Sequence, residues 1–140
     1  MAVAQGDEYL SPVSTTSAPG PIGPYSQAVA IEGTRMLFVS GQLPLVGETG
    51  EIAPGGISAQ ARVALENAIS IVEASGGDRS NVAKVTLFVT NIDDGPAINE
   101  IYGDVFAPPF PARTTVEVSR LPRASLIEVD VVAALPSRTD

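Results

Sequence analysis

The chain has 140 residues, of which 44% are hydrophobic and 17% are charged, and this balance is typical of one soluble globular domain. Its net charge of −8 argues against nucleic acid or an anionic membrane as a partner. It contains no cysteine and no histidine, which excludes disulfides, thiol nucleophiles, imidazole acid–base chemistry and the usual zinc sites. Any catalysis must therefore use carboxylates, arginine, hydroxyls, backbone groups and water.

The two ends of the chain are expected to lie outside the folded domain. We interpret residues 1–17 as a flexible N-terminal tail, 18–136 as a single domain, and 137–140 as a short C-terminal tail. Asp7 and Glu8 stand where a signal peptide would need a basic start and an apolar run. No apolar run approaches the roughly 20 residues of a membrane span. We therefore expect a cytoplasmic protein.

Two strands are predicted in the first third of the domain. The proline-rich run 18–24 is an extended approach to a short strand at 25–31. Residues 36–39 are apolar at four consecutive positions, which is typical of a strand covered on both faces. Helices can cover one face, and the other needs a second sheet or another subunit.

A loop, a helix and a third strand follow. Glycine and proline are dense in 43–56, which predicts a loop, and 57–75 has the apolar period of an amphipathic helix. The two glycines at 76–77 end that helix, and 82–90 is predicted to be a strand.

The last part of the domain is predicted to hold one more helix and two strands. Asp94 can cap the helix, and the proline-rich run 107–111 ends it. The strands at 111–118 and 126–135 are interpreted as an antiparallel hairpin. The resulting order, β-β-α-β-α-β-β, predicts an α+β fold with two helices on one face of a mixed sheet.

An arginine in the first strand of that hairpin is the main candidate for chemistry. Strand alternation places Arg113, Thr115 and Glu117 on one face. Thr114, Val116 and Val118 lie on the other face, which we predict to be the core face. Glu128 and Asp130 have the parity to share the Arg113 face of the hairpin, so Arg113 and Glu128 are expected to lie close together. Two interpretations stay open: a buried or interfacial salt bridge, or a site in which Arg113 binds a substrate carboxylate and Glu128 orients water.

Several spaced motifs occur in an order that is characteristic of one family. The motifs are Gly23-Pro-Tyr-Ser-Gln27, Ser40-Gly-Gln42, Ala59-Gln-Ala-Arg62 with Leu65-Glu-Asn67, Asn99-Glu-Ile-Tyr102, and the run from Pro111 to Val118. Over residues 18–135 the chain resembles the reactive intermediate deaminase (Rid, or YjgF) family, and it is most similar to the RidA branch.

The resemblance implies a chorismate-mutase-like fold whose sheets pack into a homotrimer, with the helices outside and the sites in clefts between neighbouring subunits. Family members hydrolyse reactive enamines and imines, such as 2-aminoacrylate and 2-iminopropionate, to the 2-keto acid and ammonia. They use no metal and no organic cofactor. The implied partners are therefore a small 2-imino acid and further copies of this chain.

The resemblance also implies roles for single residues. Arg113 matches the arginine that binds the substrate carboxylate, and Glu128 matches the acidic residue associated with the attacking water. Tyr25, Ser40 and Asn99 match residues of the substrate pocket.

Two features depart from the family pattern. Thr115 is also implied to bind substrate, but it stands where some members carry cysteine, so only its backbone groups retain a clear role. The connection at 106–110 is short, which bears on the rim of the pocket and on substrate size.

Two other functions stay open beside the deaminase. A non-catalytic member would use the same cleft to sense a small carboxylate metabolite. A ribonuclease or translation inhibitor, as some relatives are described, would have to bind RNA with a net charge of −8 and no histidine.

Overall fold

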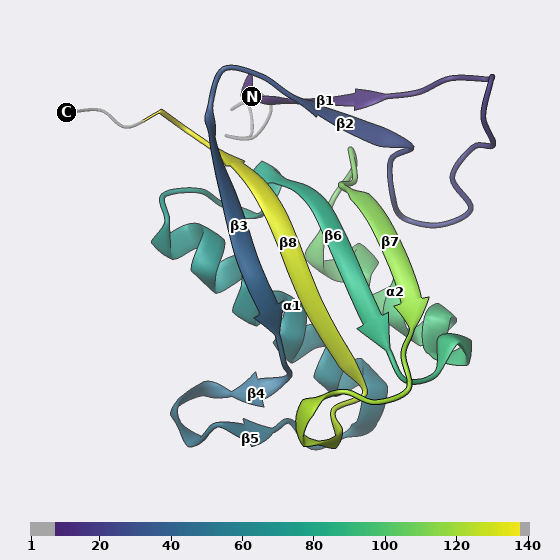
Figure 1. Ribbon diagram of the computed structural model, residues 1–140, viewed down its shortest axis with the longest axis vertical. Helices are drawn as coiled ribbons and strands as arrows, with labels where there is room; N and C mark the ends of the chain where they lie inside the picture. Colours follow the sequence, from purple (N-terminus) through teal and green to yellow (C-terminus); the bar gives the residue numbers. More distant parts are fainter. Residues whose placement is uncertain (1–7, 138–140) are drawn as a thin grey trace.

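A four-stranded mixed sheet forms the centre of the computed structural model, which describes residues 8–137 (Figure 1). Its strands, in spatial order, are β3 (Arg35–Gln42), β8 (Ile127–Leu135), β6 (Val82–Val89) and β7 (Ala112–Glu117). The β3–β8 and β8–β6 pairs are antiparallel, whereas β6 and β7 are parallel. The predicted α+β class is confirmed, and the fold is chorismate-mutase-like.

Both helices cover one face of this sheet (Figure 1). The helix predicted at 57–75 is α1 (Gly56–Ala74), and the second predicted helix is α2 (Gly95–Val105). Asp94 precedes α2 as predicted, but its side chain makes no capping hydrogen bond. Within the described part of the chain, no helix is long and apolar enough to cross a bilayer.

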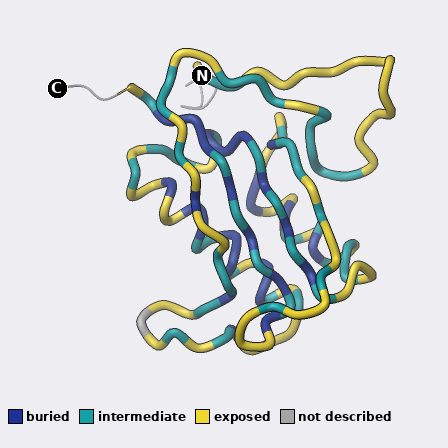
Figure 2. The backbone as a smooth tube through the Cα atoms, viewed as in Figure 1, coloured by how far each residue is buried: buried dark blue, intermediate teal, exposed yellow. Residues whose placement is uncertain are grey.

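The hydrophobic core lies between the sheet and the helices. Alternate residues of β8 point into it, as the sequence pattern predicts, and they are buried: Ile127, Val129, Val131 and Ala133. The apolar stripe of α1 packs against them, with Leu65 and Val72 fully buried. Figure 2 shows the buried stretches of the central strands and of the helices behind them. Burial of this kind contributes about 25 cal/mol for each Å² of apolar surface removed from water, and it supplies most of the stabilisation.

The predicted hairpin of the last two strands is wrong. β6 lies between β7 and β8, and β7 pairs only with β6 among the strands of this sheet. The reason is the connection: β6, α2 and β7 form a strand–helix–strand unit, and a helical crossover returns the chain parallel to the strand that it left. β7 is therefore an edge strand whose neighbour is not the next strand in sequence.

Two small ribbons flank the sheet. β1 (Leu10–Val13) pairs antiparallel with β2 (Ala28–Ile31), so residues 10–13 of the predicted tail form a strand. Residues 1–7 of that predicted tail and 138–140 of the C-terminal one lie outside the described residues. The predicted loop 43–56 contains a second ribbon, formed by β4 (Leu45–Val46) and β5 (Glu51–Ile52).

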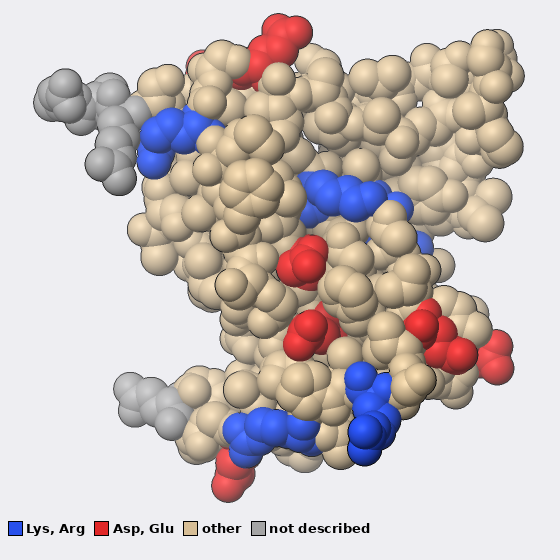
Figure 3. Space-filling model, in the orientation of Figure 1, with Lys and Arg blue, Asp and Glu red and all other residues tan. Residues whose placement is uncertain are grey.

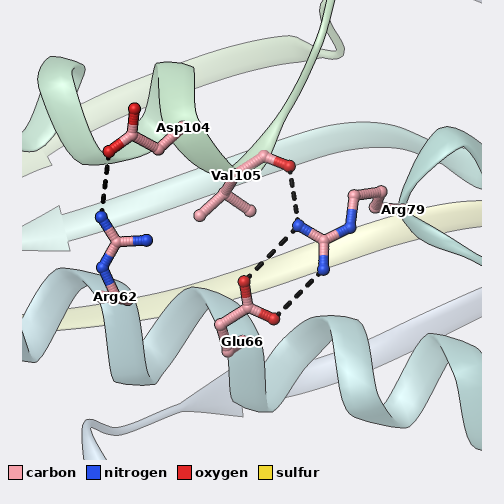
Figure 4. A network of polar contacts seen from close by, with 5 residues as sticks. All are labelled: Arg62, Glu66, Arg79, Asp104 and Val105. Atoms are coloured by element: carbon pink, nitrogen blue, oxygen red, sulfur yellow. Dashed lines mark hydrogen bonds and ion pairs between the residues drawn. The ribbon is translucent and has the colours of Figure 1, made fainter.

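A polar network joins the C-terminal end of α2 to α1 and to the turn before β6 (Figure 4). Arg79 donates to the carbonyl of Val105 at 2.9 Å and contacts Glu66 at 3.3 Å. Arg62 pairs with Asp104 at 3.0 Å. These side chains are largely solvent-exposed, so each ion pair adds only about 0.2–1 kcal/mol. Their effect is to fix the end of α2, from which the chain enters β7.

Candidate active site

Arg113 lies on the helix side of β7, which corrects the predicted assignment of its two faces. It is in register with Val85 of β6, and in-register residues of parallel strands share a face. Val85 is fully buried in the core, whereas Val116, which was predicted to face the core, is 38% exposed. The charged face of β7 is thus turned toward α2, and its Thr114 and Val116 face points away from the helices.

Three side chains surround the guanidinium of Arg113. Its Nη1 donates a hydrogen bond to Oδ1 of Asn99 at 2.8 Å. The Cζ atom lies 5.5 Å from the ring centroid of Tyr25 and 4.9 Å from that of Tyr102. Contacts at these distances stabilise a cation over an aromatic ring. We call these four residues the Arg113 cluster.

Arg113 has no anionic partner among the side chains that the structure describes. No carboxylate among the described side chains lies within 4.0 Å of its nitrogens. Burial lowers the pKa of Arg113, and the nearby Tyr102 and Tyr25 raise it to a smaller extent. A desolvated guanidinium without a counter-ion is costly, and a bound carboxylate would relieve that cost. Of the two interpretations left open for Arg113 and Glu128, a salt bridge between them within one chain is absent from the described residues.

Tyr25 is held over Arg113 by a short strap, residues 22–27. The Ser26 hydroxyl donates to the carbonyl of Phe110, and its backbone N–H donates to the carbonyl of Pro111 at 3.0 Å. The Tyr25 hydroxyl accepts a hydrogen bond from the N–H of Ile22 at 3.1 Å. The strap is therefore anchored to the connection that leads into β7, and it covers one side of the guanidinium.

Tyr102 was not identified as a site residue from the sequence. It is fully buried, and its hydroxyl has no hydrogen-bond partner among the described residues. Burial raises the pKa of Tyr102 far above its usual value, while the Arg113 charge acts in the opposite direction. Its spacing of three residues from Asn99 on one helix was the signal available in the sequence, because such residues share a helix face.

Thr115 lies two residues beyond Arg113 and on the same face of β7. Its Oγ1 is buried and likewise has no hydrogen-bond partner among residues 8–137. The structure thus places Thr115 beside the Arg113 cluster, and its role in binding stays a prediction.

Glu128 and Ser40 lie on the other face of the sheet. Glu128 alternates with the buried Ile127 and Val129 of β8, so its side chain points away from the helices. Figure 3 looks onto this face and shows carboxylates over the middle of the sheet. Ser40 is near the end of β3, where the register with β8 shifts between Val39 and Gln42.

The Glu128 carboxylate rests directly against the residue that follows Ser40. A Cβ atom built on Gly41 would lie 2.7 Å from Oε2 of Glu128. No hydrogen bond or ion pair joins the Glu128 side chain to another described residue. We call Ser40, Gly41 and Glu128 the Glu128 cluster.

The two clusters cannot meet within one chain. Arg113 and Val131 are both in register with Val85 of β6, and Glu128 lies three residues from Val131 along β8. Two strand spacings and three residues separate the Cα atoms of Arg113 and Glu128 by roughly 14 Å, and the side chains point in opposite directions. The expectation that they lie close together on one face is therefore wrong for a single chain.

The Arg113 cluster can bind and orient a small carboxylate, and the Glu128 cluster offers a carboxylate able to hold water. Among the described residues, no group of three or more histidine, cysteine, aspartate or glutamate side chains is placed to hold a metal ion. The side chains of the two clusters offer a guanidinium, a carboxylate, an amide and hydroxyl groups.

Comparison with known proteins places this arrangement in a family. Residues 15–135 match the Endoribonuclease L-PSP family, which is the YjgF/Rid family. The chain belongs to this family. The resemblance found in the sequence motifs is confirmed.

Members of the Rid family related to this chain carry more than one functional name. Human 2-iminobutanoate/2-iminopropanoate deaminase is 42% identical over 121 residues, covering 86% of this chain and 87% of the human protein. Protein DfrA of Myxococcus xanthus is 45% identical over 121 residues, covering 86% of this chain and 92% of that protein.

Solved structures of Rid proteins share the fold. RidA from an Antarctic Psychrobacter species is 33% identical with a TM-score of 0.70, and the match covers 89% of this chain and 99% of that one. Escherichia coli TdcF with bound serine is 39% identical with a TM-score of 0.67, covering 92% and 99% of the two chains.

Proposed function

We propose that this Rid protein is a hydrolase that deaminates small 2-imino and 2-enamino acids, of the 2-iminopropionate and 2-aminoacrylate type, to 2-keto acids and ammonia. The observation that carries this proposal is the half-buried Arg113 guanidinium, which has aromatic and amide neighbours but no carboxylate within 4.0 Å among the described residues. The relatives named imine deaminases support it.

Arg113 binds the substrate carboxylate in this proposal. Its Nη1 is oriented by Asn99, and the remaining N–H groups are left for a forked contact with two carboxylate oxygens. Such a charge-assisted contact contributes about 1.5–3 kcal/mol. Because Tyr25 and Tyr102 fix the position of the guanidinium, little side-chain entropy is lost when the substrate binds.

Glu128 delivers the water. The imine carbon is already electrophilic, so Glu128 needs only to accept a proton from water as the oxygen attacks that carbon. That proton passes to the nitrogen and gives a carbinolamine. The hydroxyl proton of the carbinolamine is then also transferred to the nitrogen as the carbon–nitrogen bond breaks, so ammonia leaves and the keto group forms. Each turnover consumes one water and one imino acid and releases one keto acid and one ammonia. A 2-enamino acid first tautomerises to the imine.

The site is completed in this proposal by a second copy of the chain, in a homotrimer. Arg113 and Glu128 point to opposite faces of one sheet, so only different subunits can bring them together. The open face of the sheet also carries large apolar side chains in water: Phe38 is 71% exposed and Met36 is 53% exposed. This face supports the prediction that a subunit covers the second face of the 36–39 strand.

The first test is keto-acid and ammonia release from 2-iminopropionate that an amino-acid oxidase generates in the assay. Wild type is compared with Arg113→Ala, and semicarbazide traps the free imine. Faster release with wild type alone supports the deaminase. No acceleration by wild type, with its assembly intact, favours a metabolite-binding protein, and retention of RNA at physiological salt would favour the RNA-directed alternative.

The second test measures the mass of the particle in solution by sedimentation equilibrium. Phe38→Glu places a charge on the open sheet face and is expected to yield monomers without activity. Ile71→Glu is the matched control, because Ile71 is a partly exposed residue of α1, on the helix side. A trimer that survives Phe38→Glu would contradict assembly through this face.

A further inference from the structure

The backbone conformation of Gly41 does not explain why this position is glycine. Gly41 lies inside β3, where glycine has low strand propensity and carries an extra cost in conformational entropy. It is absent from the glycines with positive φ, so its conformation is open to any residue. A glycine without such a requirement, inside a strand, often marks the close approach of another group.

The group that approaches Gly41 is the carboxylate of Glu128. A Cβ on Gly41 would lie 2.7 Å from Oε2, 2.9 Å from Cδ and 3.2 Å from Cγ of that side chain. The first two separations are shorter than real Cβ contacts, and the third is tighter than most of them. An alanine at this position would therefore force the carboxylate to move.

The fold itself does not require this contact. Gly77 offers the comparison, because a Cβ there would meet Leu135 at 2.7 Å and Asn81 at 3.0 Å, and both of these residues are buried. Gly41 instead is exposed, and the atoms it would meet are the far end of a flexible side chain. Since Glu128 has no hydrogen bond to another described residue, moving its carboxylate breaks no interaction of the fold.

We propose that Gly41 is a positioning residue that acts through Glu128. Its missing side chain lets the Glu128 carboxylate lie flat against β3, next to Ser40, and this placement aims the water in the proposed deaminase site. The inference rests on the proposed function. Under this proposal, Gly41 contributes to catalysis through the space that its missing side chain leaves for the Glu128 carboxylate.

The proposal predicts that adding a side chain at Gly41 slows the chemical step and leaves substrate binding unchanged. A displacement of about 1 Å in a reacting group costs roughly 10²-fold in rate, so Gly41→Ala is expected to lower kcat by about 10- to 100-fold. KM should stay near its wild-type value, because in the proposed site the substrate carboxylate is bound by Arg113 and not by Glu128.

The test is a double-mutant cycle on the trimeric fraction, with kcat and KM measured for wild type, Gly41→Ala, Glu128→Gln and the double variant. If Gly41 acts only through Glu128, the double variant has the kcat of Glu128→Gln, because the displaced carboxylate no longer exists. Gly103→Ala is the control, since an added Cβ there has nothing within 4 Å, and it should retain wild-type kcat.

The outcomes separate this inference from the proposed function. An inactive wild type overturns both. An active wild type overturns the inference alone if Gly41→Ala keeps full kcat, if its loss adds to that of Glu128→Gln, or if it fails to assemble. Loss of kcat at unchanged KM and Tm in Gly41→Ala, absent from the Glu128→Gln background, supports it.

Discussion

The Arg113 cluster and the Glu128 cluster differ in how much of their environment one chain supplies. Arg113 is surrounded by two aromatic rings and an amide, from a strap, a helix and a strand. Glu128 lies close against Gly41 of β3 and has no hydrogen bond to another described residue. The position of the Arg113 guanidinium is thus fixed by contacts within the chain, whereas the Glu128 carboxylate has no polar contact with another described residue.

This difference follows from the position of each group in the sheet. β7 is an edge strand, so its helix-facing side chains can be reached by a strap that comes from the start of the domain. β8 is a central strand, and no helix or strand of the described residues covers the face that carries Glu128 (Figure 1). The Arg113 guanidinium is thus ordered by packing within the chain, whereas the Glu128 carboxylate lies on the face where we propose that a neighbouring subunit binds.

The largest effect is expected from removing the charge of the Glu128 cluster. Glu128→Gln keeps the size of the side chain but accepts no proton from water, so kcat should fall roughly 10²- to 10⁴-fold with little change in KM. Initial rates of keto-acid release measure this. Asp130→Asn is the control, because Asp130 lies on the same face of β8 two residues away. An equal loss in both variants would implicate the overall charge of the face instead.

A smaller loss is expected from the Arg113 cluster when its charge is kept. Arg113→Lys retains a cation but has no planar fork, so kcat/KM should fall roughly 10- to 100-fold, mainly through KM. Arg62→Lys, at an exposed ion pair, should leave the kinetics unchanged. Full activity of Arg113→Lys would show that a point charge suffices.

Combining the two defects tests whether the clusters belong to different chains. Arg113→Ala and Glu128→Gln subunits are co-expressed in equal amounts, and their mixed trimers are assayed. In a cyclic trimer with random mixing, about one quarter of the sites receive both intact residues, so activity should return to about one quarter of wild type. No recovery would mean that one subunit supplies both residues.

The smallest effect concerns the stability of the Arg113 cluster. Tyr102→Phe keeps the ring that contacts Arg113 and removes a buried hydroxyl without a partner. The free energy of unfolding should therefore rise by about 1 kcal/mol. Urea denaturation at one fixed protein concentration measures it. A less stable Phe variant would show that the hydroxyl has a partner in solution.

Much of the fold was accessible from the sequence because its periodicities were clear. The stripe at 57–75 and the alternation through β8 reflect burial on one side, which the structure confirms. The faces of β7 were assigned wrongly because both carry polar residues, and the charge of Arg113 suggested the outer one. The helix between β6 and β7 was the better signal, since it requires a parallel pair.

The candidate site was predictable only in part. The motifs pointed to Arg113, Asn99 and Tyr25, which the structure brings together, although their roles stay predictions. They did not reveal Tyr102, because an aromatic residue in a helix stripe is usually core. Nor did they reveal Gly41 as a spacer for Glu128, since that depends on the register between β3 and β8.

Because the strap is anchored on the connection between α2 and β7, the length of that short segment affects both the strap and β7. Ser26 bonds to the carbonyls of Phe110 and Pro111, so the segment that carries Tyr25 moves with them. One inserted or deleted residue between 106 and 111 would shift both Tyr25, which covers Arg113, and the start of β7. Libraries that vary the length of this connection should therefore change substrate range while leaving the charged residues untouched.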